Sequence, residues 1–285
     1  MQFVRYTNGS NAQWGVCQDD TIVPVAGLRE EVSYQQLTDS GFLRLVENAV
    51  KAAGSNSVAV DETRILTPVP RPGKIVCVGL NYHDHATEQD EDVPERPLLF
   101  GKASTSVTNP RDPIVHPADL EQVDYEVELG VVIGRTAKDV SASDARDYVA
   151  GYTAINDVSG RDAQFVDEQF YRGKSYDTFA PMGPSLVPDE YLEPDSLDVA
   201  CRVNGETKQS SNTSEFIFAV DELIEYISGI TTLRPGDVIS TGTPGGVGIF
   251  RDPPELLEPG DTVDVEIEGI GTLRNPVVAE SDPGV

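Results

Sequence analysis

Three carboxylates between residues 124 and 164 have the spacing of a metal site. Glu126 and Glu128 are two residues apart in the run DYEVELGVVIG, whose apolar residues alternate as along a strand, so both side chains should share one face. Asp157 follows the apolar run YTAI, where a second strand would end. Such oxygen-only sites suit hard divalent cations, so the pattern predicts Mg²⁺ or Mn²⁺, with Ca²⁺ as a further candidate. The alternative is two glutamates on the solvent face of a half-exposed strand.

A second chemical pattern lies in NYHDHATE, where His85 and Glu88 are three residues apart. One helical turn would bring them to the same face, and a carboxylate that holds an imidazole gives it the fixed tautomer that a general base needs. The acidic residues 88–97 that follow are predicted to form a mobile lid. The pair His83 and His85 could instead bind zinc, but the chain has only one other histidine, His116. The remaining alternative is a polar loop that happens to hold two histidines.

Polar and glycine-rich segments further along could bind a substrate. Arg161 and Gln164 follow Asp157 by four and seven residues, on one face of a predicted helix, and Lys174 lies in a glycine-containing loop. Cations beside a metal site can hold a carboxylate or stabilise an oxyanion. The glycine-dense residues 242–248 are neither a Walker loop nor a dinucleotide fingerprint, but their amides could cradle an anion, with Gly242 and Thr243 as substrate contacts.

The overall charge of the chain argues against nucleic acid as a partner and suggests a salty habitat. The chain of 285 residues has 48 acidic and 21 basic residues, a net charge of −27, which argues against binding to nucleic acid. Lysine is scarce, and such an acidic surface predicts a protein from a salt-loving organism. The three cysteines are too far apart for a disulfide framework or a CxxC metal site. With no apolar tract long enough for a membrane and no signal-peptide core, we expect a cytoplasmic protein.

The elements that position these residues divide the chain into two predicted parts. Residues 1–66 form a small module with strands at 2–6, 14–17 and 21–25 and a helix at 34–53. Residues 67–285 contain strands at 74–82, 97–105 and 124–134, a short helix at 143–149, an amphipathic helix within 211–230 and two final strands around a glycine turn. Strands outnumber helices, so we predict a mainly β, α+β fold built on a folded-over mixed sheet.

Several of these segments together resemble the fumarylacetoacetate hydrolase family. The motifs GLNYHDHATE, DYEVELGVVIGR, GYTAINDVSGRDAQ, RGKSYDTFAPMGP and PGDVISTGTPGGVG occur in that family's order, and the resemblance covers about residues 70–280. It implies a mixed β-sandwich roll preceded by a small N-terminal α/β module, a homodimer, and Mg²⁺ or Mn²⁺ between carboxylates. By position, the resemblance implies that the metal ligands are Glu126, Glu128 and Asp157. It implies that the catalytic dyad is His85 and Glu88. It implies substrate- or oxyanion-binding roles for Arg161, Gln164, Lys174 and Thr243.

The activity that this resemblance implies is metal-dependent cleavage of a carbon–carbon bond. We expect hydrolysis of a 2,4-diketo acid of the acylpyruvate or fumarylpyruvate type through an enolate, with a small-molecule 2-oxo acid as the partner. Neighbouring reactions share that intermediate: isomerisation or decarboxylation in homoprotocatechuate breakdown, decarboxylation of oxaloacetate, and dehydration of a 2-keto-3-deoxy sugar acid. The other class considered is a metal-binding relative without turnover, which would not need the base His85.

Overall fold

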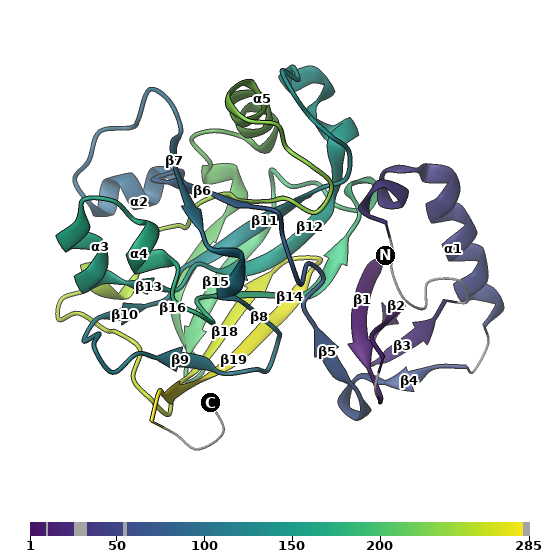
Figure 1. Cartoon of the computed structure of the whole chain (residues 1–285), viewed down its shortest axis with the longest axis horizontal. Coiled ribbons are helices and arrows are strands. Elements are labelled where there is room, and N and C mark those ends of the chain that lie inside the picture. Colours follow the sequence, from purple (N-terminus) through teal and green to yellow (C-terminus); the bar gives the residue numbers. More distant parts are fainter. Residues whose placement is uncertain (10, 26–32, 54–55, 282–285) are drawn as a thin grey trace.

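The computed structural model describes residues 1–9, 11–25, 33–53 and 56–281. A twelve-stranded mixed sheet runs through both parts of the molecule in the order β4-β3-β2-β1-β14-β12-β11-β17-β6-β7, with β5 beside β1 and β8 beside β14 (Figure 1). Its strands are β1 (Gln2–Thr7), β2 (Gln13–Gln18), β3 (Thr21–Pro24), β4 (Val58–Ala59), β5 (Arg64–Leu66), β6 (Ile75–Gly79), β7 (Leu98–Lys102), β8 (Val107–Thr108), β11 (Val127–Ile133), β12 (Val149–Asn156), β14 (Ala180–Val187) and β17 (Val238–Ser240).

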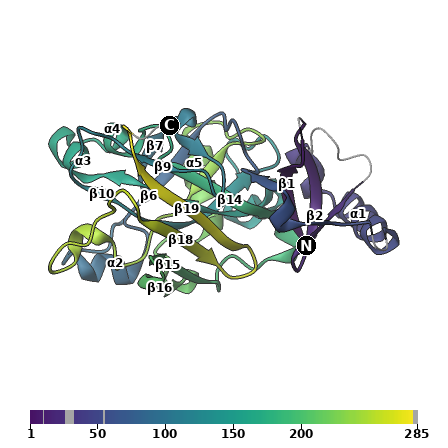
Figure 2. The same ribbon diagram turned by 90° about the horizontal axis from the view of Figure 1, so that it is seen from below.

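A second sheet of five strands, in the order β16-β15-β18-β19-β9, packs against the large one (Figure 2). Residues from the two sheets share one core cluster, for example Val131 in β11 with Val199 in β15 and Leu273 in β19. This arrangement confirms the predicted mainly β fold with mixed sheets. The five strands and the separate pair β10–β13 are β9 (Ile114–His116), β15 (Asp198–Val203), β16 (Glu206–Asn212), β18 (Thr262–Ile267), β19 (Gly271–Ala279), β10 (Val123–Asp124) and β13 (Ser159–Gly160).

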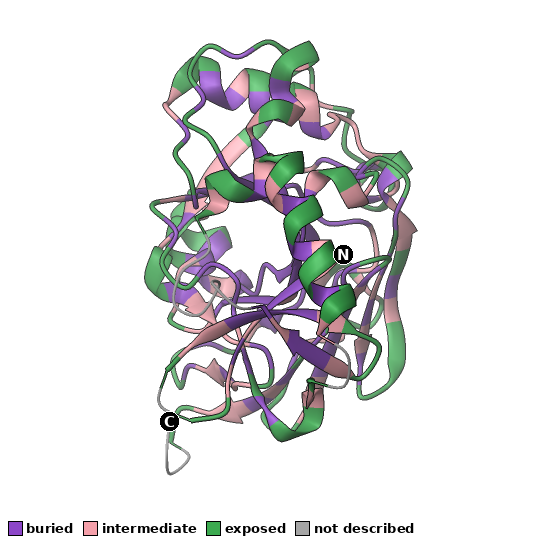
Figure 3. Cartoon of the chain, turned by 90° about the vertical axis from the view of Figure 1, so that its right-hand side faces the viewer, coloured by how far each residue is buried: buried purple, intermediate pink, exposed green. Residues whose placement is uncertain are grey.

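Helices are short and lie on the outside of the sheets, with their exposed faces toward solvent (Figure 3). None in the described part of the chain has both the length and the apolar character needed to traverse a bilayer. The α-helices are α1 (Ser40–Ala52), α2 (His83–Glu88), α3 (Arg161–Asp167), α4 (Tyr171–Lys174) and α5 (Val220–Ile230), and the 3₁₀ helices are η1 (Tyr34–Thr38), η2 (Val60–Glu62), η3 (Ser104–Ser106), η4 (Ala142–Tyr148), η5 (Asp189–Tyr191), η6 (Thr213–Glu215) and η7 (Gly248–Phe250).

The N-terminal module continues the large sheet, because β1 pairs with β14 at Phe3 and Leu186. The three predicted strands are present, but the predicted helix at 34–53 is two helices, η1 and α1. Asp39 separates them: its backbone is extended, and its side chain accepts hydrogen bonds from the amides of Gly41 and Phe42, the geometry of an N-cap that starts a new helix. The pattern of apolar residues continues across that break, so periodicity alone did not reveal it.

Two further predicted helices differ in type or extent. The short helix expected at 143–149 is the 3₁₀ helix η4. The amphipathic helix within 211–230 is α5, which begins only at Val220 and buries Leu223, Ile224 and Ile227 as expected. The residues before it contribute to β16 and η6, so Phe216 packs from a loop against Tyr82. The Glu222 side chain, which accepts a hydrogen bond from the Ala219 amide, marks the true start of α5.

Candidate active site

Two central strands bring the three predicted metal ligands together. β11 and β12 are antiparallel, and Asp157, just after β12, donates its amide to the carbonyl of Glu126, just before β11, at 2.9 Å. One oxygen from each of Glu126, Glu128 and Asp157 lies within 4.8 Å of the others. The three residues are 5%, 1% and 0% exposed, so the alternative of a solvated strand face is wrong.

Two lysines neutralise part of this cluster from opposite sides. The Lys174 ammonium lies 2.7 Å from Glu126 Oε2 and 2.8 Å from Asp157 Oδ2, and so bridges the two carboxylates. Lys102, at the end of β7, donates to the other oxygen of Asp157 and to the carbonyl of Val158. Sequence reasoning missed Lys102 as a site residue, because its partner is 55 residues away. The signal available was a lysine at the end of the apolar run PLLFG.

Arg161, predicted to bind substrate, is held by carboxylates of the protein. Its guanidinium lies 2.8 Å from Asp124 Oδ2 and 2.8 Å from Glu126 Oε1, and it donates to the side-chain oxygen of Gln164 at 3.0 Å. Burial lowers the pKa of Arg161, but Asp124 and Glu126 outweigh that effect and raise it above its ordinary value. Asp124, which sequence reasoning also missed, therefore fixes Arg161 at the cavity wall.

Glu126 and Glu128 have opposite electrostatic surroundings. Burial alone would raise the pKa of Glu126, but Lys174 and Arg161 lower it to about 2. Burial, together with Asp157 and Glu126, raises the pKa of Glu128 well above its ordinary value. The donors that hydrogen-bond to Glu128 are neutral: the Ser240 hydroxyl at 2.5 Å and the Gly242 amide at 3.0 Å. Because ionised Glu128 lacks a cationic partner among the described residues, a bound divalent cation would supply the missing charge, and the residues fit such a group.

The predicted dyad forms on α2. His85 Nδ1 lies 3.0 Å from Glu88 Oε2, and the side-chain nitrogen of Gln89 lies 2.7 Å from His85 Nε2. A carboxylate accepts and an amide nitrogen donates, so the tautomer with hydrogen on Nδ1 satisfies both contacts. The Nε2 lone pair accepts from Gln89 here, so Nε2 can act as a base only when the Gln89 amide gives up that hydrogen bond. His83 is exposed whereas His85 is 7% exposed, so the two histidines do not converge as a zinc pair would.

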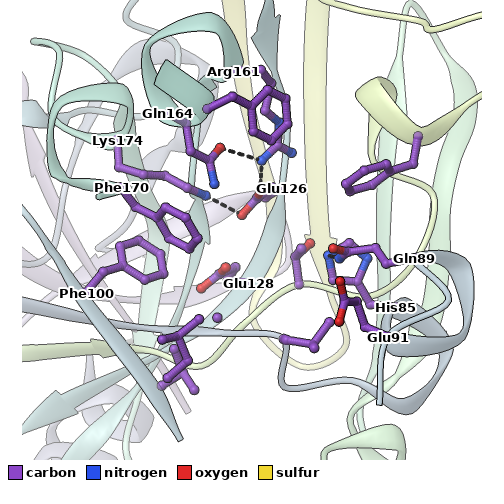
Figure 4. Close-up of a pocket in the computed structure, with 17 residues that line it drawn as sticks. His85, Gln89, Glu91, Phe100, Glu126, Glu128, Arg161, Gln164, Phe170 and Lys174 are labelled. Atoms are coloured by element: carbon purple, nitrogen blue, oxygen red, sulfur yellow. Dashed lines mark hydrogen bonds and ion pairs between the residues drawn. The ribbon is translucent and has the colours of Figure 1, made fainter. Parts of the chain in front are cut away.

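His85 of the dyad and the carboxylates Glu126 and Glu128 line one cavity of about 310 Å³. Figure 4 shows Lys174, Gln164 and Arg161 on one side of it and His85, Gln89 and Glu91 on the other, with Glu126 and Glu128 between them. Every predicted site residue except Glu88, Asp157 and Gly242 lines this cavity. The lining residues are Val78, Gly79, Leu80, His85, Gln89, Glu91, Leu98, Phe100, Glu126, Glu128, Arg161, Gln164, Phe165, Phe170, Lys174, Thr243 and Phe250.

The glycine-dense loop does bind anions, but they are the protein's own carboxylates. The amide of Gly242 donates to Glu128, that of Gly246 to Glu88 at 2.8 Å, and that of Gly248 to Asp124 at 2.8 Å. These amides are therefore engaged in orienting the site. Gly242 holds the Glu128 carboxylate and does not line the cavity. Thr243 does line it, and its hydroxyl accepts a hydrogen bond from the Gln209 side chain at 2.8 Å.

Sequence comparisons agree with this geometry. Residues 74–278 match the family model for the fumarylacetoacetate (FAA) hydrolase C-terminal domain, and residues 1–68 match one described as Rv2993c-like, N-terminal. A mitochondrial oxaloacetate tautomerase of Bos taurus is 49% identical over 220 residues, which are 76% of this chain and 70% of the relative. A Dictyostelium discoideum protein, described as a fumarylacetoacetate hydrolase domain-containing protein 2 homolog, is 42% identical over 274 residues, 92% of this chain and 88% of that protein.

Solved structures extend the similarity to the whole chain. A fumarylacetoacetate hydrolase from psychrophilic Exiguobacterium antarcticum has a TM-score of 0.87 at 39% identity, over 98% of this chain and 100% of that one. A 5-carboxymethyl-2-hydroxymuconate delta-isomerase from Mycobacterium smegmatis has a TM-score of 0.80 at 36% identity, with the same coverage. Family model, identity and fold therefore agree, and this chain belongs to the fumarylacetoacetate hydrolase family of enzymes.

Proposed function

We propose that this enzyme catalyses proton transfer next to the oxo group of a 2-oxo acid, interconverting its keto and enol forms. The observation that carries the proposal is the cavity itself, which sets the His85–Glu88 pair opposite the buried carboxylates Glu126 and Glu128. The similarity to oxaloacetate tautomerases, at 49% identity, supports the same reaction class and makes oxaloacetate the first substrate to test.

Each step of the proton transfer can be assigned to a residue of this chain. Tautomerisation moves one proton between the carbon beside the oxo group and the oxo oxygen, without change in composition. His85 Nε2 removes the proton from carbon, Glu88 holds the imidazole in position, and the protonated ring returns the proton to oxygen. Arg161 occupies the amide oxygen of Gln164, so the amide nitrogen of Gln164 remains a donor to a substrate oxygen, beside the Thr243 hydroxyl.

Glu126, Glu128 and Asp157 would hold a divalent cation, Mg²⁺ or Mn²⁺, because they supply three buried carboxylate oxygens within 4.8 Å of one another. When bound, the cation would supply Lewis-acid chemistry, polarising the oxo group so that the neighbouring carbon loses its proton more readily. Lys174 would contribute a further positive charge at the cavity wall for the substrate carboxylate.

Hydrolysis of an acylpyruvate, the activity expected from the sequence, is the second candidate. The favouring observation is the apolar part of the cavity lining, which would accommodate an acyl group and consists of Leu98, Phe100, Phe165, Phe170 and Phe250. The same dyad would then take a proton from water rather than from carbon. The attacked carbonyl would lie two carbons from the oxo group, and cleavage would release an acid and pyruvate.

The test follows the decay of enol-oxaloacetate by its ultraviolet absorbance, with Mn²⁺ or with EDTA, and measures pyruvate released from acetylpyruvate and from oxaloacetate. We expect accelerated decay that EDTA abolishes.

His85→Asn should lower kcat by about 10²–10⁴-fold and leave Mn²⁺ affinity unchanged. His83→Asn, at an exposed position on the same helix, is the matched control and should retain wild-type activity. A fully active His85→Asn variant would remove the dyad assignment. Pyruvate from acetylpyruvate would establish hydrolysis, and pyruvate from oxaloacetate alone would establish decarboxylation.

A further inference from the structure

The oxygens of Glu126 and Asp157 are all engaged by positively charged groups. Arg161 lies 2.8 Å from Glu126 Oε1, and Lys174 lies 2.7 Å from Glu126 Oε2. Lys102 contacts Asp157 Oδ1, and Lys174 lies 2.8 Å from Asp157 Oδ2. A cation such as Mg²⁺ would need an oxygen from each of these residues at roughly 2.0–2.1 Å. Each oxygen keeps a second lone pair, but a cation bound there would share its ligand atoms with these charged side chains and would repel them.

Lys174 is the one group whose departure would uncover both residues at once. Lys102 touches only Asp157 among the three carboxylates, and it is also held by the carbonyl of Val158. Arg161 touches only Glu126 among the three, and Asp124 holds its other side. Lys174 bridges Glu126 and Asp157, the place between carboxylates that a shared cation would take.

An aromatic ring of the cavity wall lies beside the Lys174 ammonium in its bridging position. The residue ends the four-residue helix α4 and lines the cavity. Its Nζ lies 5.2 Å from the centre of the Phe100 ring, a distance at which an aromatic face attracts a cation. A rotation about the side-chain bonds toward that ring would carry the ammonium into the cavity without movement of the backbone.

The charges near the site favour such an exchange. Four carboxylates, on Asp124, Glu126, Glu128 and Asp157, face three cationic side chains, Lys102, Arg161 and Lys174. With all of these groups ionised, the balance is −1. A divalent cation beside the three ligands would reverse the sign of that balance, and the ammonium that shares two of its ligands would then feel direct repulsion.

We propose that a divalent cation takes the place of the Lys174 ammonium between Glu126 and Asp157, and that the displaced ammonium enters the cavity as the group that receives the substrate's carboxylate. This inference rests on the cation site of the proposed function. It makes Lys174 a competitor of the cation before binding and a substrate contact afterwards. Cation binding would thereby prepare the substrate site, and a substrate carboxylate would bind poorly to the protein without the cation.

The decisive experiment labels the lysines of the full-length wild-type chain with acetic anhydride at low conversion, with and without Mn²⁺, and reads each site by peptide mass spectrometry. The side chains of Lys174 and Lys102 are 3% and 0% exposed, so both should react slowly without Mn²⁺. With Mn²⁺, labelling of Lys174 should rise several-fold and that of Lys102 should stay low. Lys138, whose side chain is 42% exposed, is the internal standard and should not change.

Electron paramagnetic resonance of the same samples separates two kinds of failure. Bound Mn²⁺ with unchanged labelling of Lys174 would overturn the exchange and leave the proposed function intact. Absence of bound Mn²⁺ would overturn the cation site and the exchange with it.

A pair of variants provides an independent measurement. Lys174→Met and Lys102→Met remove the same charge from the same cluster, but only the first removes the competitor. We expect Lys174→Met to bind Mn²⁺ about tenfold more tightly than wild type, equal to about 1.4 kcal/mol, and Lys102→Met to gain clearly less. Equal gains in the two variants would mean that charge alone is responsible, and no gain in Lys174→Met would contradict competition.

Discussion

Glu126 and Glu128 have the same side chain, are two residues apart and are both buried, yet the groups around their carboxylates differ in charge. Glu126 has two cationic partners, Lys174 and Arg161, whereas Glu128 has a hydroxyl and an amide. At neutral pH the ionised form of Glu126 is therefore favoured and that of Glu128 is opposed. This uncompensated carboxylate would favour the binding of a cation to the cluster, and its cost without a cation should be measurable in stability.

Glu128→Gln should stabilise the protein in EDTA. Because burial and the neighbouring carboxylates raise the pKa of folded Glu128, the wild type loses stability as pH rises from the ordinary glutamate value through the folded one. The amide removes that loss, so we expect a gain of about 1–2 kcal/mol near neutral pH that shrinks toward about pH 5. Urea unfolding at the two pH values measures it.

Glu126→Gln is the matched control and should have the opposite sign. The pKa of Glu126 is lowered to about 2, so its contribution is present above the ordinary glutamate value and is lost as pH falls toward that number. Removing this carboxylate from its ion pairs should cost about 3–5 kcal/mol near neutral pH. If the two substitutions shifted stability in the same direction, the assigned difference between their surroundings would be wrong.

At the scale of elements, the site depends on the loop after β17 as much as on the two central strands. Gly242 has φ of +100°, and its amide points at Glu128. A Cβ at Gly242 would lie 2.8 Å from Asn81 Cβ and 3.0 Å from the carbonyl of Val78. The loop can follow this path only because the residue is glycine, both for its dihedral angle and for the close approach.

Gly242→Ala should therefore destabilise the protein far more than Gly205→Ala. Gly205 also has positive φ, +82°, but a Cβ there meets nothing within 4 Å, so it isolates the cost of the dihedral angle. We expect losses of about 1 kcal/mol at Gly205 and of about 3 kcal/mol or more at Gly242. Gly242→Ala should also weaken Mn²⁺ binding, because relief of the clash moves the loop and with it the backbone amide that donates to Glu128. Thermal unfolding measures the stability of the two variants, and Mn²⁺ titration measures their affinity for the cation. Equal losses of stability at the two glycines would contradict the steric argument.

At the scale of the whole molecule, the net charge of −27 acts on every part of the structure. Self-repulsion of this size opposes the compact state, and salt screens it. The N-terminal module shares a core with the rest, in which Trp14 and Leu43 are clustered with Ile75 and Met182, so both parts should respond together. The division near residue 66, the homodimer, the cytoplasmic location and the origin in a salt-loving organism stay predictions.

Thermal unfolding in increasing KCl tests the consequence of this charge. We expect the midpoint to rise by about 5 °C or more between low and molar KCl, which for a chain of this size corresponds to about 2 kcal/mol. Sorbitol at matched osmolality is the control and should give a smaller rise, because it does not screen charge. A midpoint that is independent of KCl would show that the acidic surface does not limit stability.

The sequence by itself determined the features that depend on neighbours along the chain. Spacing of two along a strand placed Glu126 and Glu128 on one side, spacing of three placed His85 beside Glu88, and the ordered motifs identified the family. Both periodicities are properties of the local backbone, so they can be predicted without knowledge of the fold. The break at Asp39 escaped because apolar periodicity does not register a cap.

Only the tertiary structure decided which charges meet. Lys102 reaches Asp157 because β7, at the edge of the sheet, and the end of β12 converge on the cavity, and Asp124 reaches Arg161 across 37 residues. Nothing in the local pattern distinguishes these residues from the chain's many surface charges. The sequence predicted that the backbone amides of the glycine-dense loop bind a substrate anion. In the fold, the protein's own carboxylates accept their hydrogen bonds. Ion pairs between distant segments depend on strand order and register, which one sequence alone does not specify.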